Sequence, residues 1–133
     1  MSKLKDRLYY DFGLDKLGYD FMGYEFESKK DLSYHHIQPK HFEGQTTYEN
    51  GSLLCRATSH NYIHLIEEFD YKSFLMISKL ILDEKRLGYI DAEILKEIND
   101  ILCCFEKKYE FSYTKKGTLV IKEEFVRRRK FEW

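Results

Sequence analysis

Five histidines gathered in one short window are the residues of this chain best suited to chemistry. All of them fall between positions 35 and 64 of 133 residues, and four form an adjacent pair, His35 and His36, and an i,i+4 pair, His60 and His64. On a helix, the second pair lies on one face with about 5–6 Å between Cβ atoms, so both imidazoles can reach one cation. On a strand, His35 and His36 point to opposite faces and must divide their roles.

A set of this kind could supply both parts of a hydrolytic reaction. A divalent ion held by three neutral imidazoles keeps its full charge and an open coordination position, so it can bind a phosphate oxygen and stabilise the leaving oxygen. A fourth histidine that is not a ligand can take a proton from water near neutral pH, because its ordinary pKa is about 6.5. Imidazoles accept Zn, Ni, Co and Mn, whereas Mg prefers oxygen ligands, so the residues leave the metal open.

The elements that must position these histidines follow from their surroundings. Residues 32–37 favour a short strand that stops before Pro39, the only proline in the chain. Asn50-Gly51 favours a turn, and residues 52–55 after it can form a second strand that pairs with the first. Ser59 as N-cap then begins a helix that runs to Phe69. The predicted order is strand, loop, strand, helix.

The rest of the chain is predicted to be mainly helical after an irregular beginning. Residues 1–31 show no sustained period, although residues 5–12 could make a short helix. Apolar residues at helical spacing predict helices over 73–87, ending near Gly88, and over 91–109 with Asp91 as N-cap; we expect these to pack as an antiparallel pair. Residues 118–121 could add a late strand. We expect one α+β domain over 1–133: a ββα core at 32–70, a helical extension at 73–110 and a basic tail at 125–133.

The ordered pieces of the histidine window carry a resemblance to a known family. They are His35-His36-Ile37-Gln38-Pro39, Glu43-Gly44, Thr47-Tyr48-Glu49-Asn50-Gly51, Leu53-Leu54-Cys55 and His60-Asn61-Tyr62-Ile63-His64. Together they resemble the HNH endonuclease motif, whose fold is the ββα-metal or His-Me finger. Order, spacing and connecting loop all match, which is more specific than an isolated histidine pair.

The resemblance implies a role for each matching residue. His36 corresponds to the general base that activates water, and His35, His60 and His64 correspond to ligands of a divalent metal. Asn50 corresponds to the residue that holds the loop and the base in position. The family also implies a phosphodiesterase whose products carry 5′-phosphate and 3′-hydroxyl ends, and a phage or mobile-element context.

Two departures from the family pattern stand out. Many members hold a structural zinc with two CxxC pairs, and only Cys55 remains here where those pairs would be, so we expect that zinc to be absent. The family's usual Gly-Gly in the loop is Glu43-Gly44. A carboxylate at that position would repel phosphate unless it faces solvent.

Composition limits where nucleic acid could bind. Twenty-two Lys and Arg against 23 Asp and Glu give a net charge of -1, so no global positive field exists and phosphate contacts must be local. The candidates are Lys40, Arg56 and the run Arg127, Arg128, Arg129 and Lys130, although a solvated tail is an equal interpretation of that run. His41 is expected on the exposed loop, outside the ligand set.

Three cysteines, two of them sequence neighbours, do not suggest a secreted disulfide framework, and no apolar segment reaches membrane-spanning length. We therefore expect a cytoplasmic protein without a membrane partner.

The preferred hypothesis is a metal-dependent endonuclease acting on nucleic acid, DNA before RNA, with one divalent ion (Zn, Mn, Ni or Mg) as cofactor. One alternative is an inactive HNH-fold module that binds nucleic acid or protein, which the mild acidity and Glu43 favour. The other is a structural zinc site, which would have no use for His36.

Overall fold

Two short antiparallel strands and the helix after them carry the histidines. In the computed structural model, which describes residues 2–109, 111–113 and 119–121, β1 (Leu32–His36) pairs with β2 (Gly51–Cys55), with Leu32 opposite Cys55 and His36 opposite Gly51. The helix α3 (Ser59–Phe69) follows. The predicted order of strand, loop, strand and helix is confirmed, and both strand boundaries agree to one residue.

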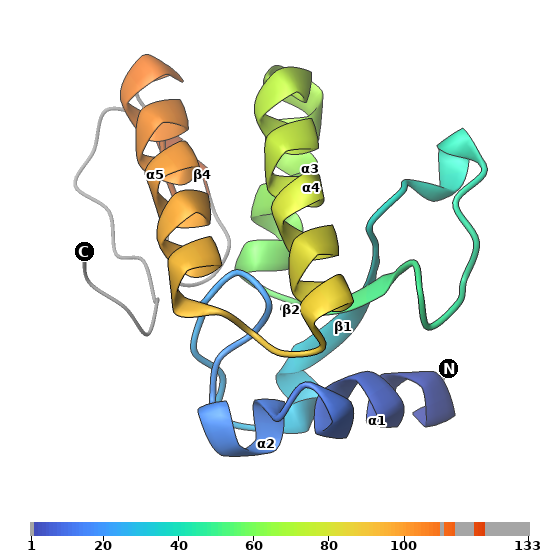
Figure 1. Ribbon diagram of the computed structural model, residues 1–133. Helices are drawn as coiled ribbons and strands as arrows, with labels where there is room; N and C mark the ends of the chain where they lie inside the picture. Colours follow the sequence, from blue (N-terminus) through green and yellow to red (C-terminus); the bar gives the residue numbers. More distant parts are fainter. Residues whose placement is uncertain (1, 110, 114–118, 122–133) are drawn as a thin grey trace.

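The two strands lie between helices, which explains why β2 is buried along its whole length. The N-terminal helix α1 (Ser2–Asp11) contacts β2, and so does α3. Figure 1 shows α1 on one side of the strands and α3, with the helices that follow it, on the other. A strand covered on both faces has no polar alternation, which accounts for the apolar run Leu53-Leu54 in β2.

The expectation of an irregular N-terminal part was wrong in extent. The helix α1 is followed by α2 (Leu14–Leu17), and a 3-10 turn, η1 (Lys29–Asp31), precedes β1. Leu8, Phe12 and Leu14 are buried in the common core. Leu4, Leu8 and Phe12 repeat every four residues, and this stripe was the signal for a longer helix.

Two long helices complete the described core. They are α4 (Tyr71–Leu87) and α5 (Ala92–Tyr109); α3 packs on α4, and α4 packs on α5. Gly88, with φ 84°, ends α4 in the left-handed conformation that favours glycine. The Asp91 carboxylate accepts a hydrogen bond of 3.1 Å from the Ile94 N–H, as expected of an N-cap. The α+β class with a ββα core and C-terminal helices is therefore confirmed.

A second small sheet follows α5. Its strands are β3 (Phe111–Tyr113) and β4 (Leu119–Ile121), paired antiparallel with Phe111 opposite Ile121. The sequence predicted the later strand but not its partner. The basic tail, including Arg127 to Lys130, lies outside the described residues. None of the described helices has the length and hydropathy needed to cross a membrane.

A buried carboxylate joins residues 20–24 to residues 55–59. Asp20 is fully buried and accepts hydrogen bonds from the backbone N–H groups of Met22 (2.9 Å), Tyr24 (3.0 Å) and Cys55 (2.8 Å). It also accepts one from the Ser59 hydroxyl. Asp20 with these four donors is called the Asp20 cluster below. It links residues 20–24 to residues 55–59 through hydrogen bonds, with no metal needed.

The Asp20 cluster also corrects one predicted role. The side chain of Ser59 does not cap α3, because its hydroxyl is committed to Asp20 and to the Cys55 N–H. Thr58 is the N-cap residue, without a side-chain capping bond. Tertiary contact thus took precedence over the local capping preference.

Candidate metal centre

Three of the predicted ligands come together in space. One ring nitrogen from each of His35, His60 and His64 lies within 4.8 Å of the others, an arrangement that could hold a metal ion. The ring centroids of His35 lie 5.2 Å from His60 and 5.5 Å from His64, and those of His60 and His64 are 4.9 Å apart. His35 projects from β1 towards the two successive turns of α3. We call these three residues the histidine cluster.

His60 is held by a serine on the neighbouring strand. The distance between Ser33 Oγ and His60 Nδ1 is 2.5 Å, and the same hydroxyl donates to the Leu54 carbonyl at 3.4 Å. When the hydroxyl proton is directed to the Leu54 carbonyl, Ser33 Oγ can accept a hydrogen bond from the Nδ1–H of His60. His60 Nε2 then keeps its lone pair for a ligand bond, as in protein metal sites where a second partner fixes the tautomer.

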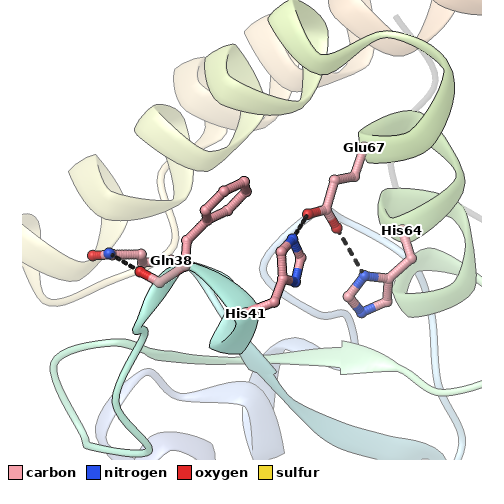
Figure 2. A network of polar contacts seen from close by, with 5 residues as sticks. Gln38, His41, His64 and Glu67 are labelled. Carbon is pink, nitrogen blue, oxygen red and sulfur yellow. Dashed lines mark hydrogen bonds and ion pairs between the residues drawn. The ribbon is translucent and has the colours of Figure 1, made fainter.

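His64 is held in the same way by a carboxylate of its own helix. Its Nδ1 lies 3.3 Å from Oε1 of Glu67, which directs the Nδ1–H to the carboxylate and leaves Nε2 free. The other oxygen of Glu67 lies 3.3 Å from Nε2 of His41. Figure 2 shows both imidazoles turned towards the Glu67 carboxylate, His64 from α3 and His41 from the loop opposite.

His35 has no such partner. Its side chain is almost fully buried, and neither ring nitrogen has a hydrogen-bond partner among the described residues. An unsatisfied buried polar group costs about 1–3 kcal/mol. A cation at the histidine cluster would satisfy one of these nitrogens, so the residues present fit a divalent metal ion.

Burial keeps two imidazoles of the cluster, those of His35 and His60, in the neutral state that binds metal. Burial lowers the pKa of His35 well below its usual value, and the neighbouring imidazoles of His60 and His64 lower it further. Burial likewise lowers the pKa of His60 to about 4. Both rings therefore carry a lone pair at neutral pH.

His36 is turned away from the cluster but lines the hollow beside it. This hollow, of about 320 Å³, is walled by His36, Lys40, His41, His60 and His64 with three further residues. β1 ends at His36, which lets consecutive histidines reach the same region from different sides. His36 Nε2 lies 2.8 Å from the Thr46 hydroxyl, a contact that the sequence did not suggest. Partial burial and the nearby Lys40 lower the pKa of His36.

Asn50 is committed to the loop. Its Oδ1 accepts from the Gln38 N–H at 2.8 Å, and its Nδ2 donates to the carbonyls of Gln38 (3.1 Å) and Gln45 (2.8 Å). The side chain thus joins both ends of the loop that carries η2 (Lys40–Phe42). Asn50 is not among the residues that line the hollow, so its contacts position the loop.

The loop geometry also accounts for the Glu43-Gly44 pair. Glu43 has φ 65°, the only non-glycine residue with positive φ in the described part of the chain. A Cβ on Gly44 would lie 1.8 Å from the Gln38 carbonyl oxygen, which no side chain can accept. The family's two glycines therefore match one residue that needs positive φ and one that needs space.

The structure places the predicted nucleic-acid contacts in three different settings. Lys40 lines the hollow beside the histidines. The Arg56 guanidinium donates to the Leu32 carbonyl at 3.1 Å and is not among the residues that line that hollow. Arg127, Arg128, Arg129 and Lys130 lie outside the described residues. The sequence missed Glu67, whose position three residues after His64 was the available signal.

Comparison with known proteins supports the first half of the site. Residues 23–57 match the family model of the HNH endonuclease, a segment that holds both strands, His35, His36 and Asn50 and ends before His60. Searches of curated proteins and of solved structures returned no match. Residues 23–57 are thus similar to the HNH endonuclease, as the resemblance predicted.

Proposed function

We propose that this protein is a metal-dependent endonuclease that hydrolyses phosphodiester bonds in nucleic acid, with DNA the preferred substrate. The observation that carries the proposal is the placement of three ligand nitrogens within 4.8 Å of one another beside a hollow that a fourth histidine lines. A cluster that only stapled the fold would need neither that hollow nor His36.

His35, His60 and His64 would hold the ion. When bound, a divalent cation stabilises negative charge on the phosphate and on the leaving oxygen. Ser33 and Glu67 fix the tautomers of His60 and His64, so that both present Nε2 to the ion.

His36 would take the proton from the attacking water. If its Nε2–H donates to Thr46 Oγ1, as the 2.8 Å contact allows, Nδ1 carries the lone pair that accepts this proton. Lys40 would hold a phosphate oxygen at the mouth of the hollow. Asn50 would keep the loop, and with it Lys40 and Thr46, at the correct distance from β1.

The inactive-module alternative rests on the net charge of -1 and on Glu43. The two hypotheses differ in what His36 does: a binding module loses nothing when His36 is replaced, whereas a nuclease loses its base. A cleavage assay on that variant therefore distinguishes them.

The test is incubation of plasmid with the protein and Zn, Mn, Ni or Mg salts, comparing wild type with His36→Ala and His60→Ala. We expect His36→Ala to cleave roughly 10²–10⁴-fold more slowly while binding metal as wild type does, measured by competition with a coloured chelator. His60→Ala should lose both metal binding and cleavage. Cleavage by His36→Ala at the wild-type rate would refute the base assignment, and no cleavage by any form with any metal would favour the module.

A further inference from the structure

A second hollow adjoins the one beside the histidines. It has a volume of about 400 Å³ and shares His41, His64 and Glu67 with the first hollow as a common wall. Its other lining residues are Phe42, Glu68 and Tyr71. A ligand that entered both hollows would therefore pass over the His41–Glu67 contact, which Figure 2 shows between the loop and α3.

Two exposed aromatic rings flank this second hollow and are held in place. Phe42 is 50% exposed and Tyr71 43% exposed, with their ring centroids 6.1 Å apart. The Phe42 carbonyl accepts from Gln38 Nε2 at 2.7 Å, and Gln38 is itself fixed by Asn50. Tyr71 stacks on the buried Phe74 at 5.5 Å. The Phe42 backbone and the Tyr71 ring are thus held in position, which reduces the freedom lost when a planar group packs against them.

The two hollows differ in charge. The first contains Lys40 and His36, which suit a phosphate. The second has no Lys or Arg among its described lining residues and contains two carboxylates. Glu67 is already shared between two histidines, whereas Glu68 is exposed and has no ion pair among the described residues. The carboxylates would repel a phosphate. A nucleobase is neutral and stacks on aromatic rings, and its exocyclic amino group can donate a hydrogen bond to a carboxylate.

We propose that this second hollow, the base pocket, binds an unpaired nucleobase next to the phosphodiester bond held in the first hollow. The Phe42 and Tyr71 rings are inclined at 61° to each other, so one ring contacts the face of the base and the other its edge, and Glu68 accepts a hydrogen bond from its exocyclic amino group. The proposal rests on the proposed nuclease function and narrows its substrate to single-stranded or locally unpaired nucleic acid, since a base inside a duplex cannot reach the pocket.

The test measures binding of short single strands in which one abasic residue is moved stepwise along the sequence. His36→Ala serves as the background, so that strands stay intact, and affinity is read by fluorescence anisotropy. One or two abasic positions should weaken binding roughly 5- to 100-fold, the range expected for loss of one stacked base. Adding Phe42→Ala and Tyr71→Ala should weaken binding of the intact strand by a similar factor and remove the sensitivity to the abasic position.

Controls separate stacking from general surface effects. Tyr71→Phe keeps the ring and should bind as the background protein does. Tyr89→Ala removes a 52% exposed tyrosine that lines neither hollow and should change nothing. In otherwise wild-type protein, the Phe42 and Tyr71 variants should raise KM for single strands far more than they lower kcat.

Failure of this proposal differs from failure of the nuclease function. If metal-dependent cleavage occurs but abasic positions have no effect, or the same effect with and without the two rings, the base pocket is wrong and the nuclease stands. If the two ring variants instead change the oligomeric state and leave strand binding unaltered, the patch is a protein contact and the proposal falls. Absence of any cleavage, with abasic sensitivity intact, would overturn the nuclease and keep the pocket.

Discussion

The histidine cluster and the Asp20 cluster each contain one fully buried polar side chain, His35 and Asp20, but the two side chains are surrounded in opposite ways. Asp20 accepts four hydrogen bonds from its surroundings. His35 has the same degree of burial and no partner for either ring nitrogen among the described residues. Burying a polar group costs free energy unless it is hydrogen-bonded, so the first arrangement stabilises the fold and the second leaves a ligand demand unmet.

The Asp20 cluster stabilises the fold through hydrogen bonds alone. One carboxylate and four donors tie residues 20–24 to residues 55–59. The histidine cluster instead brings three imidazoles together and leaves the ring nitrogens of His35 without a hydrogen-bond partner among the described residues.

The largest expected effect is a loss of stability when the Asp20 cluster is disrupted. Asp20→Ala leaves buried donors of Met22 and Tyr24 without an acceptor, so we expect a loss of about 3 kcal/mol or more in the free energy of unfolding. Urea denaturation monitored by circular dichroism measures it. Asp100→Ala, at an exposed position of α5, is the control and should stay within about 0.5 kcal/mol of wild type. A loss below 1 kcal/mol for Asp20→Ala would show that the cluster does not tie the fold.

Removal of a hydrogen-bond partner of the histidine cluster should lower the metal affinity more than it lowers the free energy of unfolding. Ser33→Ala deletes the acceptor of His60 Nδ1–H, and we expect metal affinity to fall roughly 10- to 100-fold with little change in unfolding. Isothermal titration calorimetry on the metal-free protein measures it. Ser78→Ala is the matched control, since the Ser78 hydroxyl is buried, has no hydrogen-bond partner in the described part of the chain and lies on α4, away from the histidines. Equal metal affinity in the two variants would contradict the positioning part of Ser33.

Replacement of His35 should raise the stability of the metal-free protein and abolish its stabilisation by metal. His35→Leu removes a buried polar group without partners, and we expect the metal-free protein to gain about 1 kcal/mol in unfolding free energy. The same variant should gain nothing from added metal, whereas wild type should gain about 2.7 kcal/mol at a metal concentration one hundred times Kd. Thermal melts with and without a chelator test both statements; destabilisation of the metal-free variant would mean that His35 supports the fold directly.

The last effect concerns Glu84 in α4, whose buried carboxylate oxygens have no hydrogen-bond partner among the described residues. Burial raises its pKa well above the ordinary value of 4.5, and the neighbouring Asp20 and Asp91 carboxylates raise it further. Between 4.5 and the raised folded pKa the unfolded chain releases this proton first, so stability falls as pH rises, by at most about 1.4 kcal/mol per pH unit.

Glu84→Gln should therefore flatten the decline of unfolding free energy with pH in that window. Asp20, whose pKa burial also raises, contributes a slope of the same sign and is present in both proteins. Denaturation at a series of pH values compares the two slopes. Parallel curves would show that Glu84 is ionised in the folded state at the same pH as in the unfolded chain.

Much of the site could be predicted from the sequence because its signals are local. Two histidines four residues apart on a helix must share a face, and an Asn-Gly turn between two short apolar runs must bring those runs together. The HNH resemblance then fixed which of His35 and His36 faces the helix. The predicted boundaries of β1, β2, α4 and α5 needed no information beyond period, turn residues and caps.

Long-range contacts were beyond the same reasoning. Three contacts join residues from different elements: Thr46 with His36, His41 with Glu67, and Asp20 with Ser59. No periodicity within a single element predicts such contacts. The N-cap assignment of Ser59 failed for that reason, since a partner 39 residues away competed for its hydroxyl.

The sequence by itself therefore determined the ligand types, their order and the ββα frame that carries them, because these depend on residue chemistry and on spacing within single elements. Only the tertiary structure decided which buried polar groups find partners and which stay open. That outcome depends on how separate elements pack: Asp20 meets four donors where residues 20–24 adjoin residues 55–59, whereas the ring nitrogens of His35 find no hydrogen-bond partner among the described residues.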